Sequence, residues 1–258
     1  MRTLFYTLTL VLIFIWACND NSSTNPGEPN GRLNLYLTDA AAAYDSVVIN
    51  FTQISAHLDS NWVTIQGEPQ SVNLLEWSNG RTLLLGSADV PAGKYTQIRV
   101  IIDSAKIGVD GKVFPLEVPS GAKTGLKFGP QFTITDGSTY ELVMDFDACR
   151  SIVIMGPKKN PKGYKLKPRI RLIAKAVSGS ISGVITNPED APEAFAIQGD
   201  DTVTSSLADT LSGQFVLGFL PEGIYKVSVE DTLGLRFSQE GVNVLSGQDN
   251  DIGDISLN

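Results

Sequence analysis

The spacing of apolar residues after Gly31 constrains this chain more than any other feature. Short apolar or alternating runs are separated by Gly, Pro, Asn and Asp, and no stretch shows a convincing 3.6-residue apolar period. The pattern predicts an all-β protein, and the charge distribution, repeated turn and resemblances described below divide it into two β-sandwich domains in tandem. The strand candidates are Arg32–Thr38, Val47–Leu58, Trp62–Gln66, Tyr95–Asp103, Phe132–Thr135, Tyr140–Phe146, Ser151–Met155 and Tyr164–Ala176. The best helical candidate, residues 39–45, is long enough for one turn only.

The first 30 residues are typical of an exported protein. Arg2 precedes an apolar run from Leu4 to Ala17, which is shorter than the roughly 20 residues that a membrane-spanning helix needs. Cys18 follows, before a polar stretch that continues to Asn30. This order resembles the lipobox of bacterial lipoproteins, which implies a signal peptide over residues 1–17 and a tether over residues 18–30 that begins with a lipidated Cys18. An ordinary signal peptide cleaved near a cysteine is the alternative.

The lipobox resemblance implies where the protein resides. Several acyl chains on Cys18 would hold it on a membrane of the bacterial cell envelope, the outer membrane in a Gram-negative cell. The other cysteine, Cys149, would then have no partner in the chain, and we expect a packed free thiol there.

The net charge of −8 is divided unevenly along the chain. Residues 31–176 hold 17 Lys plus Arg against 13 Asp plus Glu, a net of +4, whereas residues 177–258 hold 2 against 13, a net of −11. Such asymmetry predicts a domain boundary near Val177. An electrostatic contact between the two domains is one interaction that such asymmetry allows.

One turn occurs in both halves of the chain. Residues 90–95 read Val-Pro-Ala-Gly-Lys-Tyr, and residues 220–225 read Leu-Pro-Glu-Gly-Ile-Tyr. Proline fixes one corner of a turn, and glycine two positions later can adopt positive φ. The apolar alternation after Tyr95 is displaced by one residue relative to that after Tyr225, which predicts a β-bulge after Tyr95. Asp110 and Gly111 predict a hairpin turn.

Two resemblances cover the chain after residue 30. Residues 31–176 resemble the bacterial family called domain of unknown function 4382, which is found in envelope lipoproteins. The matching segments are Gly31–Asp39, Asp45–Val48, Val72–Trp77, Asp89–Tyr95, Asp145–Asp147 and Tyr164–Pro168. Residues 177–258 resemble the carboxypeptidase regulatory-like, or prealbumin-like, domain, whose fold is grouped with carbohydrate-binding-like sandwiches. That resemblance lies in Gly179–Val184, Gly213–Tyr225, Val244–Gly247 and Asp251–Leu257.

The composition argues against several classes of function. One histidine cannot form a histidine-rich metal site, two cysteines cannot form a disulfide framework, and the acidic balance argues against nucleic-acid binding. His57 is the only imidazole, and no Gly-x-Ser-x-Gly motif accompanies it. We interpret His57 as an exposed strand residue, and we expect no catalytic residue, resident metal or cofactor.

Asp145 and Asp147 lie on one face of a strand candidate because side chains alternate. One interpretation buries Leu142, Met144 and Phe146 and leaves both aspartates in water. The alternatives are a calcium site or an acid–base carboxylate pair, either of which would make the protein an enzyme or an enzyme accessory.

Eight cations and no acid occur between Lys158 and Lys175. In a single strand, Lys165, Lys167, Arg169, Arg171 and Lys175 would share one face. Pro168 predicts an edge strand, on which lysines discourage pairing with other chains. The alternatives are docking of this face on the acidic C-terminal domain, on the anionic envelope, or on an anionic glycan.

Trp62 and Trp77 are the candidate ligand-binding residues, because sugar sites use exposed aromatic rings beside polar groups. Packing into the core is the alternative for both. We therefore interpret the chain as a non-catalytic, membrane-anchored binding or adhesion module with a glycan as its candidate ligand. The competing interpretations are the enzyme class above and a purely structural envelope scaffold.

Overall fold

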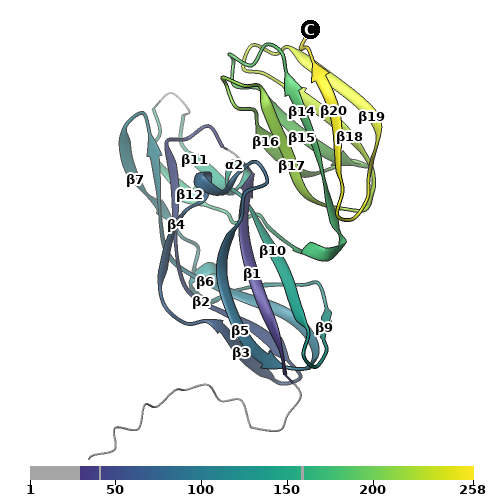
Figure 1. Ribbon diagram of the computed structural model, residues 1–258. Coiled ribbons are helices and arrows are strands. Elements are labelled where there is room, and N and C mark those ends of the chain that lie inside the picture. Colours follow the sequence, from purple (N-terminus) through teal and green to yellow (C-terminus); the bar gives the residue numbers. More distant parts are fainter. Residues whose placement is uncertain (1–29, 41, 158–159) are drawn as a thin grey trace, which may run out of the picture.

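The computed structural model describes residues 30–40, 42–157 and 160–258, and its architecture is all-β, as the sequence predicts (Figure 1). The expected signal peptide, Cys18 and the tether up to residue 29 lie outside the described residues, as do Lys158 and Lys159. Within the described part, no helix has the length and apolar character needed to cross a membrane.

Residues 30–176, here called the N-terminal unit, form two sheets. The elements are β1 (Asn30–Ala40), β2 (Ser46–Leu58), β3 (Asn61–Gln66), β4 (Gln70–Asn73), η1 (Leu74–Trp77), β5 (Leu83–Pro91), β6 (Gly93–Val109), β7 (Lys112–Glu117), α1 (Ser120–Thr124), β8 (Leu126–Phe128), β9 (Phe132–Ile134), β10 (Thr139–Asp147), α2 (Ala148–Ser151), β11 (Ile152–Met155), β12 (Gly163–Leu166) and β13 (Ile170–Ala174). Sheet A has the order β13-β10-β1-β5. Sheet B has the order β11-β12-β7-β6-β2-β3, with β4 beside β2, and with β8 and β9 beside β6.

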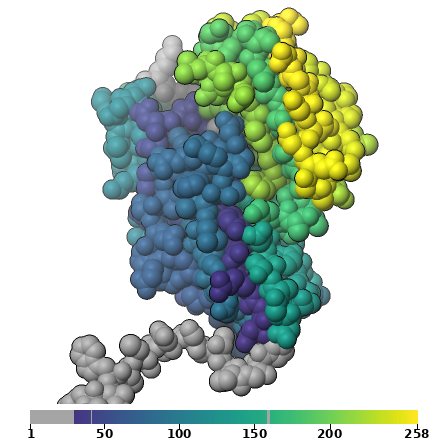
Figure 2. Space-filling model, in the orientation of Figure 1, coloured from purple at the N-terminus to yellow at the C-terminus, as the bar shows by residue number. Residues whose placement is uncertain are grey.

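The C-terminal unit (residues 178–258) follows the short 3-10 helix η2 (Lys175–Val177). Its strands are β14 (Ser178–Ile185), β15 (Glu193–Gln198), β16 (Asp201–Leu207), β17 (Gln214–Pro221), β18 (Gly223–Glu230), β19 (Arg236–Val244) and β20 (Asp249–Ile255). Sheet C has the order β17-β14-β20, and sheet D has the order β16-β15-β18-β19. The two units lie against each other (Figures 1 and 2), and the green strands β16 and β17 contact residues near the end of β10.

The buried apolar residues of the described part form two clusters. One draws on both sheets of the N-terminal unit, for example on Leu35 of β1 and Ile102 of β6, and the other on both sheets of the C-terminal unit, for example on Leu217 and Val227. Burial follows the two-residue alternation of the strands, because one face of each sheet packs on its core. Val177 lies in the connection between the strands that form these clusters.

The repeated turn adopts the same geometry in both units. Gly93 and Gly223 have φ values of +157° and +158°, and each tyrosine hydroxyl donates to the proline carbonyl four residues earlier, Tyr95 to Pro91 at 2.7 Å and Tyr225 to Pro221 at 2.9 Å. The bulge expected after Tyr95 is confirmed. Strand β2 pairs successive residues with Tyr95 and then Gln97 of β6, so the residue between them is the extra one.

The turn at Asp110 and Gly111 joins β6 to β7, and both residues have positive φ, at +50° and +71°. The hairpin prediction is therefore confirmed, since a type I′ turn needs positive φ at both central positions. The helical turn expected over residues 39–45 is wrong. Strand β1 continues to Ala40, and residues 42–45 contain no helix.

The single basic strand expected over residues 164–176 is also wrong. Strand β12 belongs to sheet B and β13 to sheet A, so the chain changes sheets between them. Pro168 lies at the break, where it cannot donate a ladder hydrogen bond. Residues on either side bond instead to Ser151, whose carbonyl accepts from Lys167 N at 2.7 Å and whose hydroxyl accepts from Arg169 N at 2.8 Å.

Candidate functional site

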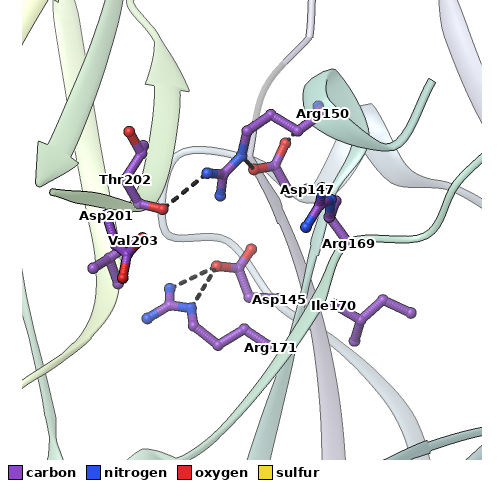
Figure 3. Close-up of a pocket in the computed structure, with 9 residues that line it drawn as sticks. All are labelled: Asp145, Asp147, Arg150, Arg169, Ile170, Arg171, Asp201, Thr202 and Val203. Carbon is purple, nitrogen blue, oxygen red and sulfur yellow. Dashed lines mark hydrogen bonds and ion pairs between the residues drawn. The ribbon is translucent and has the colours of Figure 1, made fainter. Parts of the chain in front are cut away.

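A charged cleft of about 580 Å³ lies where the two units meet (Figure 3). The N-terminal unit contributes the end of β10, helix α2 and the start of β13, and the C-terminal unit contributes the start of β16. The lining residues are Asp145, Asp147, Arg150, Arg169, Ile170, Arg171, Asp201, Thr202 and Val203. The lining contains three arginines and three aspartates, so its positive and negative side chains are equal in number and the wall is strongly polar.

Asp145 and Asp147 lie at the end of β10, and each is only 5% exposed. The interpretation that both face water is therefore wrong. Leu142, Met144 and Phe146 pack in the N-terminal core, as expected, but the opposite face of β10 is covered as well. The C-terminal unit provides part of that cover, since Thr204 Oγ1 of β16 donates to Asp145 Oδ2 at 3.2 Å.

Arg171 neutralises Asp145 and joins the two units. Its Nη2 and Nε donate to Asp145 Oδ2 at 2.6 and 3.2 Å, and its Nη1 donates to the main-chain oxygen of Phe219 at 2.9 Å. The register places Arg171 of β13 directly opposite Asp145 of β10, so the pair is also a cross-strand pair. Both side chains are largely buried, at 23% and 6% exposure.

Arg150 neutralises Asp147 and also contacts the C-terminal unit. Asp147 is the N-cap of α2, and its Oδ1 accepts from Arg150 N at 2.8 Å. Its Oδ2 accepts from Arg150 Nε, and Arg150 Nη1 donates to Thr202 O of the C-terminal unit at 2.8 Å. Each arginine therefore contacts one aspartate of β10 and one carbonyl of the C-terminal unit.

These contacts oppose the calcium and acid–base interpretations of Asp145 and Asp147. Both oxygens of Asp147 and one oxygen of Asp145 already accept hydrogen bonds from arginine. No group of three or more His, Cys, Asp or Glu side chains is placed to hold a metal ion in the described ranges. The aspartates thus act as fixed acceptors between the units.

Arg169 and Asp201 differ from these pairs. Both line the cleft and are exposed, and neither forms an ion pair with any residue that the structure describes. Figure 3 shows Arg169 on the N-terminal side of the cleft and Asp201 on the C-terminal side. A guanidinium supplies only donors and a carboxylate only acceptors, so this pair can serve a ligand that has both.

Two further carboxyl groups lie behind the cleft. Burial raises the pKa of Asp39 well above its usual value, and the neighbouring charges of Asp145 and Asp147 raise it further, although the Ala148 amide that donates to its Oδ1 at 2.9 Å acts in the opposite direction. Burial also raises the pKa of Glu193. Asp39 Oδ2 and Ser205 Oγ are buried without a hydrogen-bond partner among the described residues.

These two atoms belong to residues that line a cavity of about 10 Å³ between the units. A cavity of that size can hold one water molecule. The site favours the neutral form of Asp39, because a buried carboxylate with one oxygen that lacks a hydrogen-bond partner is costly to keep charged.

The remaining candidates lie elsewhere. Trp77 packs on the N-terminal core, and its carbonyl accepts from Thr38 near the end of β1. Trp62 is half-buried on β3 against His57, near the opposite end of the unit. The two rings do not form one surface, so a ligand would not span them. Neither lines the cleft.

His57 is more enclosed than the sequence predicts, and Cys149 is packed as the sequence predicts. His57 is half-buried, and its Nδ1 lies 2.7 Å from Thr96 Oγ1, so its interpretation as an exposed residue is wrong. Cys149 is a free cysteine packed against the core, as expected, and burial raises the pKa of its thiol to about 12. A thiol in that state is a poor nucleophile.

Sequence reasoning identified Asp145 and Asp147 but missed Arg150 and Asp201 as parts of the site. The available signal was the pair of arginines on the basic segment, Arg169 and Arg171. The remaining cations of that segment are dispersed, since Lys165 pairs with Glu117 at 3.2 Å and Lys175 with Glu141 at 3.3 Å.

Replacing Arg171 with alanine should destabilise the protein by about 3 kcal/mol, because Asp145 would remain buried without its partner. Replacing Arg169 with alanine is the matched control and should change the unfolding free energy by less than about 0.5 kcal/mol. Denaturant unfolding of both variants measures this. Equal losses in the two variants would contradict the role assigned to Arg171.

Asp39→Asn should weaken the dependence of stability on pH. Because the folded pKa of Asp39 exceeds its unfolded value, the folded protein binds more protons between the two values, and stability falls as pH rises through that window. The asparagine side chain of this variant still accepts the hydrogen bond from the Ala148 amide, but it cannot ionise. The unfolding free energy of the variant minus that of the wild type should therefore be larger at pH 8 than at pH 5. Unfolding at both pH values tests this, with exposed Asp103→Asn as control. Parallel pH dependences for the wild type and the Asp39→Asn variant would refute it.

Comparison with known protein families identifies the family of the N-terminal unit. Residues 30–168 match the family model described as "Domain of unknown function (DUF4382)", whereas no curated protein matches the chain. Solved structures with some likeness include the TIE protein of Bacillus anthracis, at 12% identity and a TM-score of 0.23, over 88% of this chain and 34% of that one. This chain therefore spans about a third of that protein.

Two pilins are similar to a comparable degree. The major pilin subunit of Bacillus cereus has 10% identity and a TM-score of 0.20, over 89% of this chain and 70% of that one. The shaft pilin of Lactobacillus rhamnosus GG has 10% identity and a TM-score of 0.19, over 89% and 97%. Likenesses at these TM-scores carry no functional argument, but the family model covers more than half of the sequence, and the chain therefore belongs to the DUF4382 family, a domain of unknown function.

Proposed function

We propose that this protein is a non-catalytic, lipid-anchored binding protein of the bacterial cell envelope, and that the cleft between its units binds a carbohydrate. The observation that carries the proposal is the division of charged groups in the cleft. Asp145 and Asp147 are committed to arginines, which leaves no free carboxylate pair for acid–base chemistry, while Arg169 and Asp201 remain unpaired among the described residues.

The chemistry of the cleft suits a hydroxyl-rich ligand. Each sugar hydroxyl can donate and accept a hydrogen bond, and Arg169 and Asp201 provide a donor and an acceptor on facing walls. The arginine and aspartate pairs beside them hold the walls in place, so little ordering is needed when a ligand binds.

The C-terminal unit is proposed to be of the carboxypeptidase regulatory-like, or prealbumin-like, kind. Its support is the sequence resemblance, whose segments correspond to β14, to β17 with the turn into β18, and to β20. In this proposal the unit forms one wall of the cleft, held by electrostatic contacts from Arg150 and Arg171.

Screening of the full-length protein on a glycan array tests the binding role. We expect at least one glycan to bind, and Arg169→Gln and Asp201→Asn to weaken that binding about tenfold each, as expected for the loss of a hydrogen bond to a charged group. Lys106→Gln, which removes an exposed charge from β6, is the matched control. An empty array would favour a structural scaffold, and binding that is insensitive to both cleft variants would remove the cleft from the proposal.

The lipid anchor is proposed on Cys18. Mass spectrometry of the N-terminal peptide from the membrane fraction should show an acylated Cys18 as the first residue of the mature chain. Cys18→Ala should release the protein from membranes, whereas Cys149→Ala should not. An unmodified Cys18 thiol, or cleavage at another position, would refute the anchor.

A further inference from the structure

We propose that the outer face of sheet B carries a second binding site, specific for the carboxylate of an acidic glycan, formed by Arg99, Lys127 and Trp62. This inference rests on the proposed function insofar as the ligand is a glycan. It differs in place and in chemistry, because the site is outside the cleft and recognises a charge.

The register of sheet B brings these side chains together. Arg99 of β6 pairs with Ser55 of β2 on one side and with Lys127 of β8 on the other. Its neighbours Ile98 and Val100 are buried in the core, so Arg99 points to the outer face. The Arg99 Cζ atom lies 4.3 Å from the ring centroid of Trp62, and Lys127 Nζ lies 5.6 Å from it.

Two cations directly opposite each other on neighbouring strands repel. Neither Arg99 nor Lys127 forms an ion pair with any carboxylate in the described residues. The Trp62 ring offsets part of the repulsion through cation–π contacts. An anion bound between the two side chains would neutralise the rest.

Arg99 is held in position for such an anion. Its Nε donates to Ser55 Oγ at 3.2 Å, and Ser55 is only 1% exposed. On the other side, Gly125 lies so close that a Cβ atom there would be 2.8 Å from the Arg99 stem, and its φ of +115° suits glycine. The terminal nitrogens Nη1 and Nη2 have no hydrogen-bond partner among the described residues, so they can bind a carboxylate with two parallel bonds.

Trp62 favours a sugar as the carrier of that carboxylate. Its half-buried ring lies under the Arg99 guanidinium and next to the His57 ring, 4.8 Å away, so the part of the ring that stays accessible adjoins the two cations. Aromatic surface together with a charged anchor matches the two chemistries of a uronic acid, an apolar ring face and a carboxylate. An anionic membrane is disfavoured, because recognition of a lipid surface uses clusters of four to eight cations.

Titration of the full-length protein in detergent with a galacturonic acid hexamer tests the site. The free acid should bind at least about tenfold more tightly than its methyl ester, which masks the carboxylates, and the affinity should fall as salt rises. Arg99→Lys keeps the charge but loses the paired hydrogen bonds, and Lys127→Gln loses the second cation. Each should weaken binding of the free acid about tenfold, whereas Lys106→Gln, on the same strand β6, should leave it within about twofold.

The result that overturns the site is equal binding of acid and ester, or unchanged affinity in both Arg99→Lys and Lys127→Gln. The two proposals fail separately. Neutral glycans that bind through Arg169 while the hexamer acid shows no preference would leave the cleft standing and overturn this site. Array binding that is insensitive to Arg169→Gln and Asp201→Asn, together with acid binding that needs Arg99, would support this site and refute the cleft.

Discussion

The contact between the two units depends on neutralising carboxyl groups that lie away from water. Asp145 and Asp147 can be buried because Arg171 and Arg150 donate to their oxygens, and each arginine also bonds to a carbonyl of the C-terminal unit. Removing an unpaired carboxylate from water costs several kcal/mol. The same bonds therefore permit the burial and fix the position of the second unit, and the cleft exists because that position is fixed.

Much of the fold could be predicted because its signals are local. Alternation of apolar residues located β1, β2, β3 and β10 within one or two residues, and the shift of that alternation after Tyr95 located a bulge. Proline and glycine identified the repeated turn, and Asp110 with Gly111 identified a hairpin. Each of these depends on the conformational preference of a few adjacent residues.

The errors have a common physical origin in contacts between distant segments. Alternation along β10 predicts that one face of the strand is exposed to solvent. The β13 strand and the C-terminal unit cover that face, so Asp145 is buried. The basic segment, residues 164–176, forms two strands in different sheets, because Ser151 accepts the hydrogen bonds on both sides of Pro168. The cleft was found only in part, because Arg150 and Asp201 come from two separate segments whose proximity no local pattern records.

The parallel pairing of β1 with β10 bears on how the molecule would resist a pulling force. Strand β1 is the first described strand, and it lies inside sheet A between β10 and β5, not at an edge. A load applied at Asn30 along the strand acts in shear on the hydrogen bonds to both neighbours, whereas an edge strand would share the same load with one neighbour only. A protein held at its N-terminus would therefore pass tension directly into an interior strand of its first unit.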